Sequence, residues 1–166
     1  MNPILAAGLF IGVFCGLWTW VMGFTGWYKD PVMMRAFFAV IVIEIIGLAW
    51  GLKRTAAQGR GWASQVVAGT LMAVVGGVLI IGFSLVFTTV LFPDYFKEID
   101  QMGRAVLEQQ GKSATEIDEA LKQSSAWANP MAQALAGFMG TLITGIFASA
   151  ALAVVIRTRP VAPEHT

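Results

Sequence analysis

Charged side chains are scarce in this chain of 166 residues, and their scarcity defines its class. Only 13% of the residues are Asp, Glu, Lys or Arg, whereas 57% are hydrophobic. A soluble domain carries about 25% charged residues, so the composition excludes an ordinary soluble protein. The net charge of +1 gives no bulk attraction to nucleic acid. We therefore expect no nucleic-acid partner.

Histidine and cysteine each occur once. His165 stands in the C-terminal tail, which argues against a histidine-based metal site or a Ser-His-Asp triad. Cys15 has no partner for an internal disulfide, and we interpret it as a small packing residue. The basic turn Gly59-Arg60-Gly61 lacks the Lys-Ser/Thr ending of a phosphate-binding loop. The sequence thus predicts no metal, no cofactor and no enzymatic activity.

What the sequence does contain is four long stretches almost free of charge: residues 4–28, 32–52, 62–92 and 130–156. A helix rises ~1.5 Å per residue, so about 20 residues cross a hydrocarbon core ~30 Å thick. We predict an all-α fold, a bundle of four transmembrane helices that forms one membrane domain over residues 1–166. The third stretch would reach ~46 Å as a straight helix, so it must tilt or project past the bilayer.

The basic residues predict how the chain is oriented. Lys53, Arg54 and Arg60 stand in the short connection between the second and third stretches, and Arg157 and Arg159 follow the fourth. Short basic segments stay on the cytoplasmic side of a membrane. The sequence therefore predicts a multi-pass protein with both termini in the cytoplasm and residues 94–128 on the opposite side.

Residues 94–128 have the pattern of an amphipathic helical hairpin. Gly111 suits the left-handed end of a first helix, and Ser113 with Glu116 matches a capping box at the start of a second. Apolar residues recur at helical spacing on both sides of this break: Tyr95, Phe96, Ile99, Met102, Val106, Leu107, Ile117, Ala120, Leu121 and Trp127. Two interpretations stay open: helices that pack on each other and on the membrane surface, or a docking surface for an outside partner.

Small residues recur every four positions in the apolar stretches. Gly8, Gly12 and Gly16 mark one face of the first helix, and Gly137, Thr141, Gly145, Ser149 and Ala153 mark one face of the fourth. In lipid such residues let helix backbones approach closely, and dispersion contacts hold them together. We expect these faces to pack within one chain, with packing between copies in a homo-oligomer as the alternative.

Glu44 is the one ionisable side chain deep inside a predicted span. It lies nine residues before Lys53, about 13 Å from that end of its helix. An acid at mid-helix costs roughly 2.5–3.5 kcal/mol to insert, so it should face protein or water. Thr70 and Ser149 lie at equal depth and are candidate hydrogen-bond partners. Glu44 is therefore either a proton- or cation-linked site or an interhelical contact that fixes packing.

The order of these parts resembles a known family. The long third stretch closes on Phe92-Pro93-Asp94-Tyr95, the segment EQQGKSATEI follows at 108–117, and Asn129-Pro130 opens the last stretch. From Asn2 to about Arg159 the chain resembles the bacterial family catalogued as domain of unknown function 4199. The resemblance implies a four-helix protein of the bacterial inner membrane, and it assigns no catalytic residue.

Three functions are compatible with this sequence. The first is a non-enzymatic scaffold or accessory subunit that packs with membrane lipids and with copies of itself or another membrane protein. The second is a small oligomeric transporter or channel that uses Glu44. The third, a lipid-modifying enzyme, ranks last because no nucleophile–base pair or metal cluster is visible.

Overall fold

The computed structural model describes residues 2–125 and 128–156, which form helices joined by short connections. In chain order the helices are α1 (Pro3–Thr25), η1 (Trp27–Lys29), η2 (Met33–Phe38), α2 (Ala39–Ala56), α3 (Trp62–Val86), η3 (Phe87–Leu91), α4 (Tyr95–Gln109), α5 (Ala114–Ser125) and α6 (Pro130–Val155). The segments η1 and η2 are 3-10 helices, and η3 is a π-helix that continues α3. No strand occurs among the described residues, so the predicted all-α class is confirmed.

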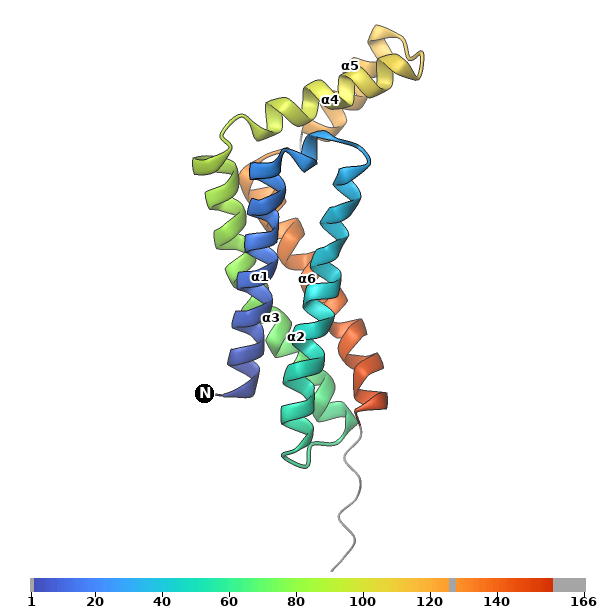
Figure 1. Cartoon of the computed structure of the whole chain (residues 1–166). Coiled ribbons are helices and arrows are strands. Elements are labelled where there is room, and N and C mark those ends of the chain that lie inside the picture. Colours follow the sequence, from blue (N-terminus) through green and yellow to red (C-terminus); the bar gives the residue numbers. More distant parts are fainter. Residues whose placement is uncertain (1, 126–127, 157–166) are drawn as a thin grey trace, which may run out of the picture.

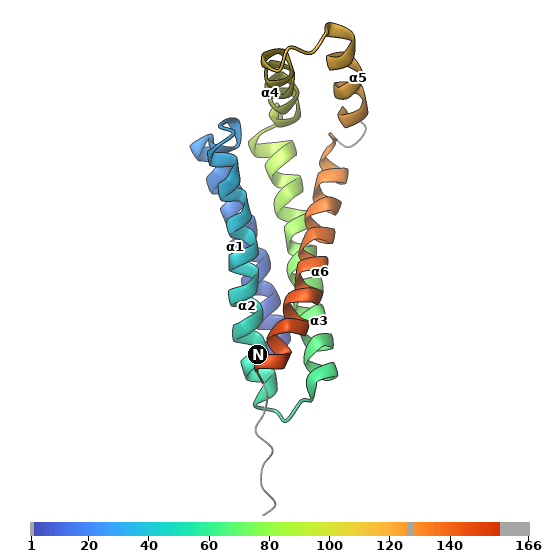
Figure 2. The ribbon, with the colours of Figure 1, turned by 90° about the vertical axis from the view of Figure 1, so that its right-hand side faces the viewer.

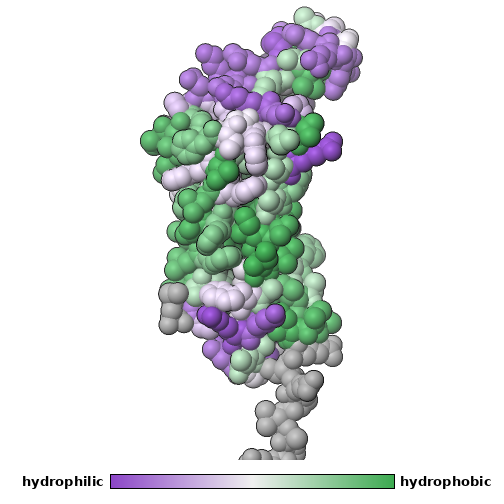
Figure 3. All heavy atoms as spheres, viewed as in Figure 1, coloured by the Kyte–Doolittle hydropathy of each residue, from purple (hydrophilic) through white to green (hydrophobic). Residues whose placement is uncertain are grey.

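Four segments are long and apolar enough to cross a membrane, as predicted: Pro3–Thr25, Met33–Ala56, Trp62–Leu91 and Pro130–Val155. On the face drawn in Figure 3, apolar residues cover the middle of the bundle and hydrophilic residues gather toward its two ends. This distribution suits a molecule whose middle contacts acyl chains and whose ends contact water.

Two of the predicted boundaries differ from the structure. The first helix ends at Thr25 instead of Tyr28, because Gly26 adopts a left-handed φ of 72° and its N–H donates to the Gly23 carbonyl. The second continues past residue 52 to Ala56. Lys53 and Arg54 extend it since cations are favourable in a last helical turn, and the Arg54 guanidinium lies 4.0 Å from the centre of the Trp50 ring.

The helix α3 packs along both α1 and α6, while α2 packs on α1 and also touches α3 and α6 (Figures 1 and 2). The N-terminus and the connection between α2 and α3 lie at one end, which we call the loop end. The helices α4 and α5, the α4–α5 pair, lie beyond the opposite end.

Glycine makes the contact between α1 and α3 close. A Cβ added to any of the three ladder glycines of α1 would overlap a side chain of α3. The overlaps pair Gly8 with Val75, Gly12 with Leu79 and Gly16 with Phe83. The small face of α1 is therefore filled by α3 within the chain.

The glycines of α6 divide into filled and open positions. A Cβ on Gly145 would overlap the Cβ of Ala73, whereas one on Gly137 would meet only Ile80, at 3.2 Å. Nothing lies within 4 Å of a Cβ on Gly140. The middle of α6 thus packs tightly on α3, and its surface nearer the α4–α5 pair is looser.

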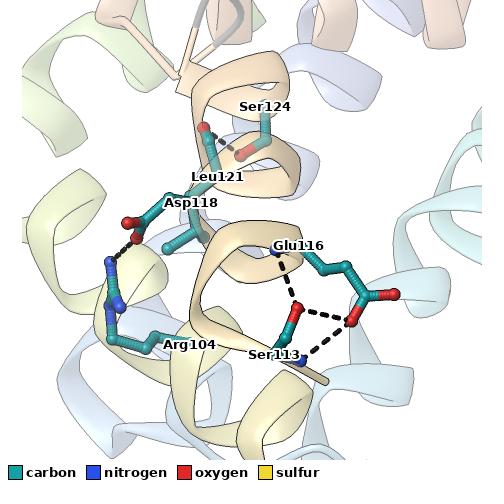
Figure 4. Close-up of polar contacts among 6 residues, drawn as sticks. All are labelled: Arg104, Ser113, Glu116, Asp118, Leu121 and Ser124. Atoms are coloured by element: carbon teal, nitrogen blue, oxygen red, sulfur yellow. Dashed lines mark hydrogen bonds and ion pairs between the residues drawn. The ribbon is translucent and has the colours of Figure 1, made fainter.

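The α4–α5 pair is stabilised by local polar contacts (Figure 4). Gly111 turns the chain with a φ of 74°. The Ser113 N–H donates to the Glu116 carboxylate at 2.9 Å, and the Glu116 N–H donates to the Ser113 hydroxyl at 3.4 Å, as expected of a capping box. Arg104 of α4 pairs with Asp118 of α5 at 2.7 Å. Ile117 is buried, and Trp127 lies outside the described residues.

Candidate functional site

Glu44 lies inside the bundle, with 3% of its surface exposed. Its Oε1 would lie 3.2 Å from a Cβ on Gly145, so the carboxyl group packs where α6 carries no side chain. On the α1 side, the Cys15 thiol donates to the Val40 carbonyl, one turn before Glu44, at 3.5 Å. The oxygen Oε1 is fully buried without a hydrogen-bond partner among the described residues. Such a group is costly in an apolar interior.

Thr70 and Ser149, the two residues expected to form hydrogen bonds with Glu44, have other surroundings. The Thr70 hydroxyl donates to the Val66 carbonyl of its own helix at 2.9 Å. Ser149 is fully buried, and its Oγ fills the space left by Gly69 without a hydrogen-bond partner. Ser149 therefore lies in the interior of the bundle one turn nearer the loop end than Gly145, and neither hydroxyl donates a hydrogen bond to the Glu44 carboxyl among the described residues. The reason is that Gly145, and neither hydroxyl, faces the carboxyl.

Sequence reasoning missed a further polar residue of this interior. Gln65 of α3 is 1% exposed, and its Oε1 accepts a hydrogen bond from the buried Thr55 hydroxyl of α2 at 2.6 Å. Its amide nitrogen Nε2 has no partner among the described residues. Thr55 and Gln65 stand on either side of the short connection between α2 and α3. Two polar residues close to the same loop were the sequence signal that could have predicted their contact.

A second candidate site is an open groove of about 670 Å³ between α4 and α5. Its lining consists of Phe96, Lys97, Asp100, Gln101, Arg104, Leu121, Lys122 and Ser125. Three cations with one acid give this groove a positive lining. The surrounding segment 94–129 is acidic, with seven acids and four basic residues. Lys97 and Lys122 are both exposed.

The base of the α4–α5 pair is joined to the bundle by three side chains. The buried Tyr28 donates its hydroxyl to the Glu98 carboxylate, and the Lys29 ammonium contacts the other Glu98 oxygen at 2.8 Å. The hydrogen bond from Lys29 lowers the pKa of Glu98, and the same contact raises the pKa of Lys29. Burial and then Glu98 raise the pKa of Tyr28.

Aromatic rings reinforce the same junction. Tyr28 packs on Phe92 and Tyr95, and Phe87 of the π-helix packs on both of those rings, with centroid separations of 4.7–6.2 Å. Edge-on and offset ring contacts contribute beyond the area that they bury. Together with the Glu98 contacts, they fix the start of α4 on the end of the bundle.

No cluster of three His, Cys, Asp or Glu side chains suited to a metal ion occurs within residues 2–125 and 128–156. His165, Arg157 and Arg159 lie outside the described residues.

Comparison with known proteins places the chain in a family. The family model described as "Protein of unknown function (DUF4199)" matches residues 7–158. The chain therefore belongs to that family, as the sequence resemblance indicates. Comparison with curated proteins and with solved structures gives no match.

Proposed function

We propose that this member of the DUF4199 family is a non-enzymatic scaffold or accessory subunit, whose bundle holds the α4–α5 pair in position to bind a partner protein. The proposal rests on a difference between the bundle and the α4–α5 pair in how much of their surface is covered within the chain. The small-residue face of α1 is filled by α3 within the chain. The α4–α5 pair is anchored at its base but leaves most of its side chains exposed.

The chemistry of the groove between α4 and α5 indicates what the partner presents. Lys97, Arg104 and Lys122 line it together with the apolar side chains of Phe96 and Leu121. A segment with acidic side chains and one apolar anchor complements this lining, because opposite charges steer association and buried apolar contacts supply affinity. Arg104 is already paired with Asp118, so Lys97 and Lys122 are the cations of the groove without an ion-pair partner among the residues that the structure describes.

A photo-crosslinking amino acid at Gln101 tests this proposal in native membranes. Gln101 lines the groove and is exposed. We expect a protein adduct of defined mass, and we expect Lys97→Gln with Lys122→Gln to abolish it. The control is Lys112→Gln, which removes one positive charge from an exposed residue outside this groove, where the double variant removes two from its lining. An adduct that is equally strong in all three proteins would contradict the groove as the binding site.

The proposed location is a bacterial inner membrane, with the loop end in the cytoplasm and the α4–α5 pair outside it. The basic residues Lys53, Arg54 and Arg60 at the loop end support this orientation. Single cysteines at Gln58 and Gln110 in a Cys15→Ala background test it. An impermeant thiol reagent applied to intact spheroplasts should label position 110 and spare position 58, and the reverse pattern would invert the topology.

A second candidate function is an ion-linked transporter or channel, oligomeric or monomeric, and the buried Glu44 carboxyl favours it. An unpaired acid inside a membrane bundle is costly, and such residues mark proton or ion pathways. Reconstituted vesicles loaded with a pH-sensitive dye test this function. If Glu44 carries protons, Glu44→Gln should assemble normally and lose pH-dependent flux. If Glu44 only fixes packing, the amide should preserve whatever flux the native protein has.

A further inference from the structure

Within the part of the chain that the structure describes, three buried polar atoms of the bundle have no hydrogen-bond partner: Nε2 of Gln65, Oγ of Ser149 and Oε1 of Glu44. They come from three different helices, α3, α6 and α2. Among the described residues, no other buried side-chain nitrogen or oxygen is left unpaired in this way. Buried polar groups in proteins are normally satisfied, and water is the common partner where protein groups do not reach.

The three atoms follow one another along the bundle axis. Gln65 and Gly69 are one turn apart on α3, and the Ser149 hydroxyl rests on Gly69. One turn farther, Ala73 of α3 meets Gly145 of α6, and Gly145 faces the Glu44 carboxyl. Successive levels are four residues of α3, about 6 Å, apart. One water with a hydrogen bond of about 3 Å to each side bridges groups at that separation.

We propose that Gln65, Ser149 and Glu44 form a polar file that orders water molecules and conducts protons between the loop end and the Glu44 carboxyl. This inference rests on the second candidate function and adds the route and its direction. The Thr55 hydroxyl, bonded to Oε1 of Gln65, leaves the amide nitrogen available to the file. A proton that binds the Glu44 carboxylate leaves the adjacent water. That water regains one from the next position, while Gln65 and Ser149 keep their protonation states.

The surroundings of Glu44 give the file one open direction. On the α6 side the carboxyl faces Gly145, which packs on Ala73 of α3, and neither residue titrates. The nearest titratable group on α1 is the Cys15 thiol, which donates to the Val40 carbonyl one turn before Glu44. Thr141 lies one turn beyond Gly145, toward the α4–α5 pair, and is itself buried. No unpaired buried atom among the described residues continues the file in that direction. Access is therefore from the loop end.

Infrared spectroscopy of the full chain in lipid nanodiscs tests the file without any transport assay. The Glu44 carboxyl band is identified as the band lost in Glu44→Gln. Its hydrogen–deuterium exchange is then followed in the native protein and in Ser149→Ala and Gln65→Leu. We expect each of these variants to slow exchange by about tenfold, because each removes one hydrogen-bonding position from the route. The control is Thr141→Val, which keeps the shape of the side chain and lies on the side of Glu44 away from the loop end. It should leave the exchange rate of the Glu44 carboxyl unchanged.

Each outcome decides the proposal. Slowing by Ser149→Ala, with Thr141→Val at the native rate, supports access from the loop end. Since Ser149→Ala removes a single buried oxygen, it stays informative if Gln65→Leu does not fold, which circular dichroism detects. Equal rates in all variants overturn the file. So does slowing by Thr141→Val alone, or a Glu44 carboxyl that never protonates while the protein is folded. If the rates change as expected but vesicles show no flux, the file stands and the transport function fails.

Discussion

The four-helix bundle and the α4–α5 pair are held together in different ways. In the bundle, glycines let backbones approach until a single added methyl group would overlap a neighbour, as at Gly145 and Ala73. In the α4–α5 pair, polar contacts such as Arg104–Asp118 and the Ser113 cap join exposed residues. Bundle stability should therefore depend on shape, and the pair should depend on individual hydrogen bonds and charges.

The largest expected effect is in the bundle. Gly145→Ala places a methyl group against the Cβ of Ala73, and α3 and α6 must separate to admit it. Overpacking of this kind costs about 1–3 kcal/mol. Unfolding of the purified protein in mixed detergent micelles should show this loss of stability.

The control for that experiment is another glycine of the same helix. Gly140 is exposed, and nothing lies within 4 Å of an added Cβ. Gly140→Ala should leave stability unchanged or raise it slightly, since alanine favours the helix. Equal destabilisation by Gly140→Ala and Gly145→Ala would mean that these glycines do not act through contact with α3.

A smaller effect is expected where the two regions join. Tyr28→Phe removes the hydroxyl that donates to Glu98, while it keeps the aromatic ring in its contacts with Phe92 and Tyr95. The loss should be about 1–1.5 kcal/mol and should be confined to the base of the pair. Amide hydrogen exchange should therefore quicken at the start of α4 and stay unchanged in α3. Faster exchange throughout α3 would contradict a local anchor.

The same junction should depend on pH. The pKa of Glu98 is lowered from 4.5 in the folded protein, so its contact stabilises above that value and is lost as the pH falls through the lowered pKa. The pKa of Lys29 is raised from 10.5, so its contribution is complete below that value and is lost as the pH rises through the raised pKa. Exchange at the start of α4 should be slowest relative to unstructured amides between these limits, and Glu98→Gln should remove the acid-side loss.

The smallest effect is expected at the far end of the pair. Ser113→Ala deletes the hydroxyl that accepts from the Glu116 N–H and should cost about 0.5–1 kcal/mol of local stability. Hydrogen exchange should quicken in the first turn of α5 only. Ser124→Ala, whose hydroxyl donates to the Leu121 carbonyl within the same helix, is the matched control and should have little effect.

The sequence predicts the bundle well because its determinants are local. Length and apolar composition define the four spans, and the capping residues Gly111, Ser113 and Glu116 place the break between α4 and α5. Boundaries were less accurate, since Gly26 ends α1 early and Lys53 and Arg54 extend α2. Those outcomes depend on backbone geometry and on a ring contact at Trp50, which hydropathy does not record.

The site was predicted only in part. Depth along the helices groups Glu44 with Ser149, whereas the structure places Ser149 beside Gly69, one turn nearer the loop end than Gly145. Depth also cannot give the rotation of each helix about its own axis. That rotation places Gly145 against the Glu44 carboxyl and leaves the Thr70 hydroxyl on its own backbone. Gln65 was missed because it stands three residues into α3, where an isolated polar residue suggests the membrane interface.

If the bundle is closed on itself and the α4–α5 pair meets other proteins, exposed positions in the two regions should have different neighbours in the membrane. The direct measurement is a comparison of photo-crosslinking from Gln101, in the groove of the pair, and from Phe147, which is 72% exposed on α6. We predict a protein adduct from position 101 and lipid adducts alone from position 147. An adduct between copies of the chain from position 147, with none from position 101, would contradict the account.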